Sequence, residues 1–412
     1  MSCSESEELI NDASKKENEH TLTPAEASSN VLEFISKMNT SSRSTTPATI
    51  ADVQPFILPS DIASRASVQC PDTLFYVVNF ANDKGFAIAG ADDRDPEIYA
   101  IVEDGTFSYN DSTAVGFNMF LSNLINMKLF NTMSENPDDT DDHPGENPDD
   151  PDTERDGDRV GGNGPHPEDN HDFFDVMSPL LKTKWGQQYF YNIFCPNEYK
   201  TGCVPTAIAQ IFSYLESPNY VTYCKNGESM SAYLDWDTIN YECETNNGVP
   251  SSPLIQRNIA VLMRYLGVIF ESDYEADITE TCLEDALDVL QEGHMNVTNL
   301  RDYNINNVIQ DLNDGNKIII IRGYTNKHHI LFAIPIYSGG HTWVVDGYIR
   351  ERQNGELTKY LHCNWGDNGD NIGYFLSTVL DAGITPSYRD NVSSRSESHV
   401  KYKIETATFT KQ

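Results

Sequence analysis

A cysteine in the first turn of a predicted helix constrains this chain more than any other feature. Residues 201–210 read TGCVPTAIAQ, and the apolar residues after the cysteine recur with the spacing of one helical face: Ile208, Ile211, Phe212 and Leu215. Pro205 suits a first turn, because its missing N–H would have no helical partner there. Cys203 therefore lies at the positive end of a helix dipole, which lowers the pKa of a thiol and favours the nucleophilic thiolate.

Two roles fit a cysteine in this place. A buried structural thiol at a helix start is the commoner role. A nucleophile is the other, and Gly202 favours it, since the absence of a side chain beside the sulfur lets a substrate backbone approach. The choice depends on whether the rest of the chain supplies partners for a thiolate.

Partners of the required kind occur elsewhere in the chain. A thiolate nucleophile needs a histidine that moves protons and a group that orients the histidine. His341 follows a glycine turn and opens an apolar strand 138 residues after Cys203, and Asn364 follows Cys203 by 161 residues. This order and separation match the papain-type arrangement. Upstream, Gln187 offers a side-chain amide that can join the Cys203 N–H in an oxyanion hole.

At these motifs the chain resembles the streptopain-like cysteine peptidases, a bacterial group with a papain-type fold. The resemblance runs from about residue 172 to the C-terminus, in Lys182 to Gln187, Gly202 to Gln210, Gly340-His341 and Asn364-Trp365-Gly366. It implies that Cys203 is the nucleophile and His341 the general base and acid. It further implies that Gln187 donates to the oxyanion and that Asn364 orients His341. Trp365 would shield the bond between His341 and Asn364 from water.

Some residues compete with this assignment or depart from the pattern. His362 would face the same side of its strand as Asn364, but we favour His341 as the base because the glycine turn exposes it. Asp346 lies too far along one strand to orient His341. Pro205 replaces an alanine of the group, and Asp367 stands where the group often has a second tryptophan, which puts the shape and charge of the substrate cleft in question.

Residues 171–412 predict a mixed helix and sheet domain in the papain-type order. Apolar periodicity predicts helices at 253–266, 283–290 and 305–312, followed by strands at 317–321, 329–336, 341–348, 357–364 and 373–376. The fold class is therefore α+β: a papain-like catalytic domain with a helical part and an antiparallel sheet.

Residues 26–134 predict a smaller α+β unit in front of this domain. A short amphipathic helix at 31–38 and a loop at 39–52 precede a strand hairpin at 74–91, a strand at 98–102 and a helix at 115–127. The unit resembles the streptopain prodomain in Tyr76 to Phe80, Gly85 to Ile88 and Ala91 to Arg94. The resemblance implies an intramolecular inhibitor that blocks or distorts the cleft until it is cut away. An accessory module without inhibitory function is the alternative.

The two remaining segments are polar. Residues 135–170 carry fourteen acidic residues and two arginines, with many Pro and Gly, and predict a disordered linker. Activating cleavage by another protease is expected there, with Arg155 and Arg159 as the basic targets, although a cut near residue 170 fits equally. Residues 1–25 predict a flexible tail.

Composition restricts the partners and the location of the protein. The formal net charge of −35 argues against nucleic acid and anionic membranes as partners, and no apolar run is long enough to span a bilayer. We expect a secreted or cell-envelope protein whose natural signal peptide has been removed. Cys3 is either the lipid-modified first residue of a bacterial outer-membrane lipoprotein or an incidental tail cysteine. A lipid there would be the only link to a membrane.

Cysteine spacing argues against a zinc knuckle or a redox motif, since none of the eight cysteines forms a C-x-x-C pair. A Cys224–Cys243 disulfide stays open, and no metal or organic cofactor is expected. The chain is thus predicted to be a secreted bacterial cysteine endopeptidase, made as a latent zymogen, that cleaves protein or peptide substrates through a thiolate–imidazole pair and an acyl-enzyme. Two alternatives are another Cys-His acyl-transfer enzyme (a transglutaminase or cell-wall amidase) and a catalytically silent binding or inhibitory module.

Overall fold

The structure is a computed structural model that describes residues 20–42, 49–57, 73–108, 115–134, 171–225, 227–324, 340–380 and 403–412. Three sequence predictions lie outside these residues: the tail before residue 20, which includes Cys3, the linker at 135–170 and the strand at 329–336. Within the described ranges, none of the helices has the length and apolar character that crossing a membrane requires.

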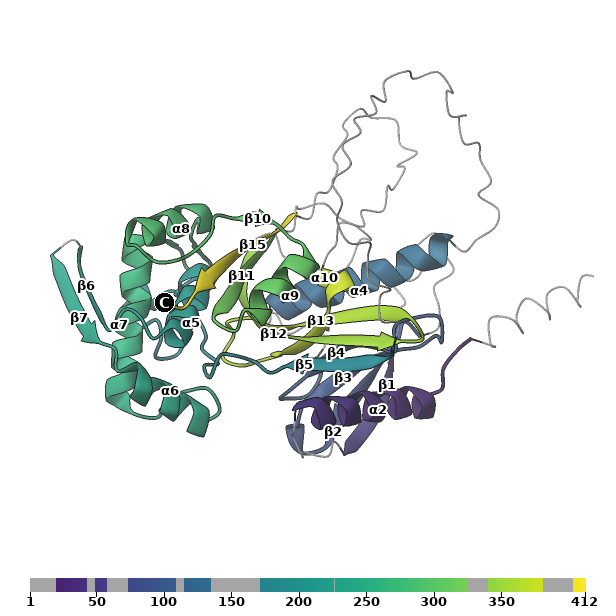
Figure 1. Cartoon of the computed structure of the whole chain (residues 1–412). Coiled ribbons are helices and arrows are strands. Elements are labelled where there is room, and N and C mark those ends of the chain that lie inside the picture. The colour runs from purple at the N-terminus through teal and green to yellow at the C-terminus, as the bar shows by residue number, and fades with distance from the viewer. Residues whose placement is uncertain are drawn as a thin grey trace, which may run out of the picture.

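One antiparallel sheet runs through both halves of the chain (Figure 1). Its strand order is β1-β2-β3-β4-β14-β13-β12-β11-β15-β10, with β5 paired to the second half of β12. The N-terminal half contributes β1 (Ile50–Phe56), β2 (Phe75–Phe80), β3 (Phe86–Gly90) and β4 (Ile98–Val102). The C-terminal half contributes β5 (Phe173–Met177), β10 (Arg301–Asp302), β11 (Lys317–Tyr324), β12 (His341–Gln353), β13 (Glu356–Asn364), β14 (Gly373–Leu376) and β15 (Lys403–Thr410).

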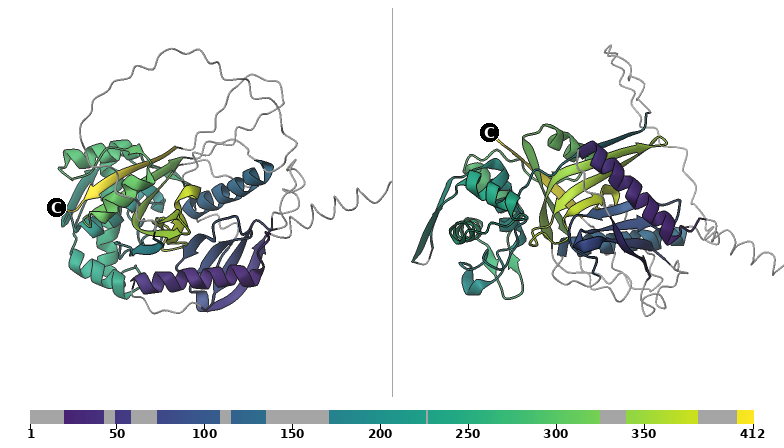
Figure 2. Two further views of the ribbon diagram at one scale, coloured as in Figure 1. Left: turned by 45° about the vertical axis from the view of Figure 1, so that its right-hand side comes forward. Right: turned by 90° about the horizontal axis from the view of Figure 1, so that it is seen from below.

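Two helices cover opposite faces of the N-terminal strands, α2 (Pro24–Ser42) and α4 (Val115–Ser134) (Figures 1 and 2). Every residue of β2, β3 and β4 is buried, which is the pattern of strands covered on both faces. A capping box starts α2: the Thr23 N–H donates to the Glu26 carboxylate (2.8 Å) and the Glu26 N–H to the Thr23 hydroxyl (3.3 Å), with Pro24 in the first turn.

The two halves meet where β4 pairs with β14. Gly373 lies opposite Val102, Tyr374 opposite Ile101 and Phe375 opposite Ala100. Apolar residues of α2, α4, the N-terminal strands and the C-terminal sheet form a single core. The N-terminal unit therefore extends the sheet of the second half and shares its core, rather than lying apart as a separate domain.

Around β11 and the start of β12, one face of the C-terminal sheet packs against a group of helices. These helices are α5 (Cys203–Leu215), α6 (Trp236–Thr245), α7 (Pro253–Ile269) and α8 (Leu283–Glu292). Ile318, Ile320 and Val344 of the sheet share a second core with α5, α7 and α8. A further helix, α9 (Ile305–Asn313), belongs to the first core. Two short hairpins complete the helical part: β6 (Tyr220–Lys225) with β7 (Glu228–Tyr233), and β8 (Asp273–Tyr274) with β9 (Thr279–Glu280).

Most sequence predictions of elements are confirmed within the described residues. The loop predicted at 39–52 is wrong in part, because α2 continues to Ser42 and edge strand β1 starts at Ile50. Sequence analysis also missed β5, α6, the β6–β7 hairpin and β15. No disulfide joins Cys224 to Cys243, since both are free, the first exposed and the second buried in α6.

The β4–β14 junction gives a direct test of the shared sheet. A side chain at Gly373 would overlap the carbonyl oxygen of Ile101. We expect Gly373→Val to destabilise the uncut chain by about 2–3 kcal/mol, as overpacking does, with a lower thermal midpoint. In Gly293→Ala the nearest atom to the new Cβ is 3.3 Å away, a tight contact that a small shift relieves, so the midpoint of this control should fall less. Equal midpoints for the two variants would contradict the described junction.

Candidate active site

Cys203 is the first residue of α5, as the sequence predicts. Gly202 precedes the helix with a φ of 93°, in the left-handed region that favours glycine. Two side-chain contacts fix this turn: the Thr206 hydroxyl donates to the Gly202 carbonyl (2.9 Å) and lies 2.7 Å from the Thr201 hydroxyl. The turn presents the Cys203 sulfur at the N-terminus of a helix that is buried along most of its length.

The sulfur of Cys203 lies against β12. The backbone and hydroxyl of Thr342 and the N–H groups at the start of α5 favour the ionised form of this sulfur. Loss of hydration nevertheless raises the pKa of the Cys203 thiol above its ordinary value of 9.0. The predicted lowering of this pKa is therefore wrong for the uncut chain, because burial outweighs the helix N-terminus.

His341 opens β12, but its side chain faces away from Cys203. Side chains alternate along a strand. Thr342 faces the sulfur and Val344 the core with α5, whereas Trp343 belongs to the core with α4. The His341 ring stacks on Trp343 at 6.1 Å and so lies on the α4 side of the sheet. In this conformation the nucleophile and the predicted base are on opposite faces.

Helix α4 occupies the space next to the imidazole. A Cβ added to Gly116 would overlap the Trp365 indole and lie 2.9 Å from Cδ2 of His341, so only glycine fits at this contact. Nε2 of His341 lies 2.9 Å from the carbonyl oxygen of Trp365. Burial lowers the pKa of His341 to about 4. The uncut chain therefore keeps the imidazole neutral and apart from the thiol.

Asn364 is engaged with other partners than His341. Its Nδ2 donates to the Thr183 carbonyl (2.9 Å) and to Oε1 of Gln210 (3.2 Å). Its Oδ1 accepts from Nε2 of Gln210 (3.3 Å) and from the Gly366 N–H (3.2 Å). The predicted bond between Asn364 and His341 is not formed among the described residues, and the Trp365 carbonyl holds the imidazole instead.

Trp365 and Gln187 lie close to the residues they were predicted to serve. The Trp365 indole is buried against Trp343 (5.1 Å between ring centres) and donates to the Asn371 carbonyl (2.9 Å). It packs beside His341 without covering an Asn364 bond. The Gln187 carbonyl accepts from the Thr201 N–H (3.0 Å), two residues before Cys203. The main chain of Gln187 is thereby fixed to the loop that carries the nucleophile.

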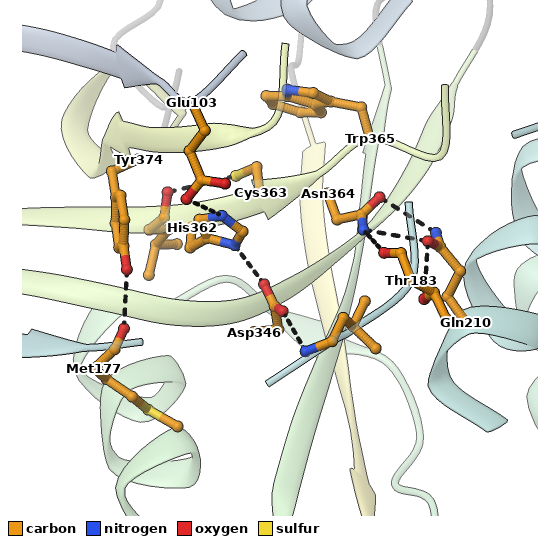
Figure 3. A network of polar contacts seen from close by, with 12 residues as sticks. Glu103, Met177, Thr183, Gln210, Asp346, His362, Cys363, Asn364, Trp365 and Tyr374 are labelled. Carbon is orange, nitrogen blue, oxygen red and sulfur yellow. Dashed lines mark hydrogen bonds and ion pairs between the residues drawn. The ribbon is translucent and has the colours of Figure 1, made fainter. Parts of the chain in front are cut away.

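His362 belongs to a buried charged network that sequence analysis missed (Figure 3). Its Nδ1 lies 2.6 Å from Oδ1 of Asp346, and its Nε2 lies 3.3 Å from Oε1 of Glu103, in the loop after β4. Burial alone would lower the pKa of His362, but the two carboxylates outweigh burial and raise the pKa to about 10. His362 is therefore a charged link between the two halves and not a competing base for Cys203.

The comparisons with known proteins include two family models and two similar solved structures. Residues 185–375 match the model of the Peptidase C10 family, and residues 19–127 match the model of the Spi protease inhibitor. The solved structure of a Prevotella intermedia prointerpain A fragment is similar with a TM-score of 0.52 at 21% identity, covering 86% of this chain and 98% of the other. The structure of active Prevotella intermedia interpain A matches with a TM-score of 0.39 at 23% identity, covering 57% of this chain and 93% of the other. The curated proteins gave no match.

Fold and family matches together define the class of the protein: a latent cysteine endopeptidase of mixed helix and antiparallel sheet, preceded by an inhibitor-like prodomain. The prodomain is the N-terminal unit that carries β1–β4, α2 and α4. Residues 185–375 form a Peptidase C10 (streptopain family) domain, and this match lies entirely within the half that carries Cys203 and His341.

The charged network predicts how prodomain docking responds to pH. A pKa of His362 raised from 6.5 to about 10 stabilises the folded chain fully below pH 6.5, and this contribution is lost as the pH rises through 10. Burial alone would raise the pKa of Glu103, but the charge of His362 outweighs burial and lowers the pKa of this carboxyl. The contribution of Glu103 to stability is therefore lost as the pH falls, not as it rises. We expect the thermal midpoint of the uncut chain to fall between pH 7 and pH 10.

Glu103→Gln tests this assignment. With one carboxylate removed, the pKa of His362 is raised less, so the midpoint should fall by fewer degrees over the same pH range. Asp104→Asn is the matched control, because Asp104 is paired with Lys184 (3.2 Å) and not with His362. A Glu103→Gln profile parallel to that of the parent chain would show that Glu103 and His362 are not coupled.

Proposed function

We propose that the released enzyme cleaves peptide bonds with Cys203 as nucleophile and His341 as general base and acid. The Cys203 thiolate attacks the scissile carbonyl, and the Cys203 N–H and the Gln187 amide stabilise the oxyanion. Imidazolium at His341 protonates the leaving amine, and the imidazole then activates the water that releases the acyl-enzyme. The carbonyl of Trp365, rather than the amide of Asn364, holds the imidazole in the form described here.

One observation carries the proposal: α4 packs against His341 and Trp365, and His341 must move before it can reach Cys203. Gly116 fits directly against Trp365 and His341, while the Cys203 sulfur already touches Thr342, the next residue of β12. A rotation at the first residue of the strand, without a change of register, would carry the imidazole from the α4 side to the sulfur. We infer that removal of α4 permits this rotation and that latency depends on its presence.

The alternative functions fit less well. A transglutaminase or a cell-wall amidase would share the Cys-His chemistry, but the Peptidase C10 match favours peptide hydrolysis. A silent binding module would not need a thiol at a helix N-terminus next to the strand that carries a histidine. Comparing protein substrates with peptidoglycan separates the first two classes.

We also propose that the protein is exported, as a secreted or cell-envelope enzyme, and that another protease activates it by cutting the linker at 135–170. The strongly acidic composition and the likeness to a protease inhibitor in the prodomain support this proposal. Lipid on Cys3 remains a prediction. Mass spectrometry of the natural protein would test both: a mature N-terminus within or just after the linker is the expected result for activation, and a lipidated Cys3 peptide from the uncut chain would distinguish a lipoprotein from an incidental tail cysteine.

Cys203→Ala tests the nucleophile. After limited trypsin digestion, the parent chain should cleave a peptide library and bind a thiol-directed affinity probe. Cys203→Ala should lose activity by about 10⁴-fold or more. Cys224→Ala removes an exposed thiol on the β6–β7 hairpin and should retain full activity. Retained cleavage in Cys203→Ala would refute the proposed chemistry.

Gly116→Val tests the origin of latency. The larger side chain would collide with Trp365 and His341, and overpacking of about 1–3 kcal/mol should shift the chain toward the released state. Because 1.4 kcal/mol corresponds to tenfold, we expect about tenfold more activity before trypsin treatment. Ser122→Ala, on the same helix, is the control. Unchanged activity of uncut Gly116→Val would show that α4 does not restrain the site.

A further inference from the structure

We propose that Gln210 is a positioning residue for the oxyanion hole. Its side chain fixes the segment that leads to Gln187 against the helix that carries Cys203. The inference rests on the proposed function, since it assigns Gln187 and the Cys203 N–H to the oxyanion. Gln210 does not touch the reacting atoms. It acts through the segment 183–187 and through Asn364.

Gln210 is fully buried, and its amide binds two separate parts of the chain (Figure 3). Oε1 accepts from the Trp185 N–H (2.9 Å), the Thr183 hydroxyl (3.2 Å) and Nδ2 of Asn364 (3.2 Å). Nε2 donates to Oδ1 of Asn364 (3.3 Å). One side chain therefore connects α5 to the extended segment before Gln187 and to the end of β13.

The position of Gln210 on α5 makes this connection specific. Gln210 follows Cys203 by seven residues, which is two helical turns, so both residues lie on the same face of one rigid helix. At the other end, the Gln187 carbonyl is held by the Thr201 N–H beside the nucleophile. Two anchors, one at Trp185 and one at Gln187, thus fix the main chain of this segment relative to the helix that carries the sulfur.

Asn364 takes part in the same arrangement. Its Nδ2 binds the Thr183 carbonyl, while its Oδ1 faces Nε2 of Gln210. Asn364 therefore supports the oxyanion segment from the sheet, and Gln210 supports it from the helix. An apolar side chain at position 210 would leave the Trp185 N–H and the Asn364 amide without these buried partners, and the segment would lose its fixed position.

The competing role for Gln210 is purely structural: it would fill space in the core without influencing the oxyanion hole. The two roles differ in what they change. A filler affects global stability alone, whereas a positioning residue affects the mobility of residues 183–187 and the binding of a tetrahedral adduct. Both the mobility of the segment and the binding of the adduct must therefore be measured. The variants must separate the effect of side-chain volume from that of hydrogen bonding.

Hydrogen exchange in the uncut chain is the first test, because it requires no activation. In Gln210→Met, a variant of similar volume, peptides that contain the Trp185 amide should exchange at least about tenfold faster, since one lost hydrogen bond is worth about that factor. Gln210→Glu keeps an acceptor oxygen and should restore part of the protection. Ser213→Ala, a buried polar change one turn along α5, is the control. Parent-like exchange in Gln210→Met would overturn the proposal.

Two reagents on the trypsin-processed full chain provide the second test. A peptide aldehyde forms a tetrahedral adduct that needs the oxyanion hole, whereas iodoacetamide needs only the thiolate. In Gln210→Met, aldehyde affinity should fall about 10- to 100-fold, while the alkylation rate of Cys203, followed on its own peptide by mass spectrometry, should stay within about threefold. Gln210→Glu should recover aldehyde binding in part.

Each result has a distinct meaning. Equal losses with both reagents, or no loss with either, would overturn the positioning role. If the processed parent chain and Cys203→Ala are equally inactive, the proposed function fails, while the exchange result still decides whether Gln210 fixes the segment.

Discussion

The rest of the structure depends on the pairing of β4 with β14. Through this pairing a prodomain strand becomes the next strand of the catalytic sheet, and the apolar residues of both halves close into one core. The strand pairing also fixes the position of α4. This helix packs on the N-terminal strands and on the catalytic strands that β4 joins to them. Gly116 is brought against His341 and Trp365 as a consequence. We infer that latency follows from how the sheet is completed, through the contact of α4 with His341 and Trp365.

Electrostatics at the site agree with this account. Burial raises the pKa of the Cys203 thiol and lowers that of the His341 imidazole to about 4, so both groups are neutral near pH 7. A thiolate and an imidazolium stabilise each other only when they are adjacent. The strand alternation that separates them removes this stabilisation. The buried charges of His362 and its two carboxylates instead join the two halves.

Local patterns in the sequence predicted the elements that carry the site. Helical spacing after Cys203 and the apolar run after His341 specify a helix and a strand, because each depends on neighbours within a few residues. The face on which His341 lies could not be predicted, since it depends on α4 packing from more than two hundred residues away. The partners of Asn364 and the link from Glu103 to His362 were missed for the same reason. Strands β5 and β15 were also missed, because each forms by pairing with a strand that is distant in the sequence, β12 and β11 respectively.

The central claim is that the prodomain keeps Cys203 and His341 apart and neutral. The most direct measurement is the thiolate absorbance near 240 nm, taken as the difference between the parent chain and Cys203→Ala across a pH titration. The account predicts that the uncut chain shows this thiolate only above about pH 9, and that processing moves its appearance below about pH 7.5. Identical titrations before and after processing would contradict the account.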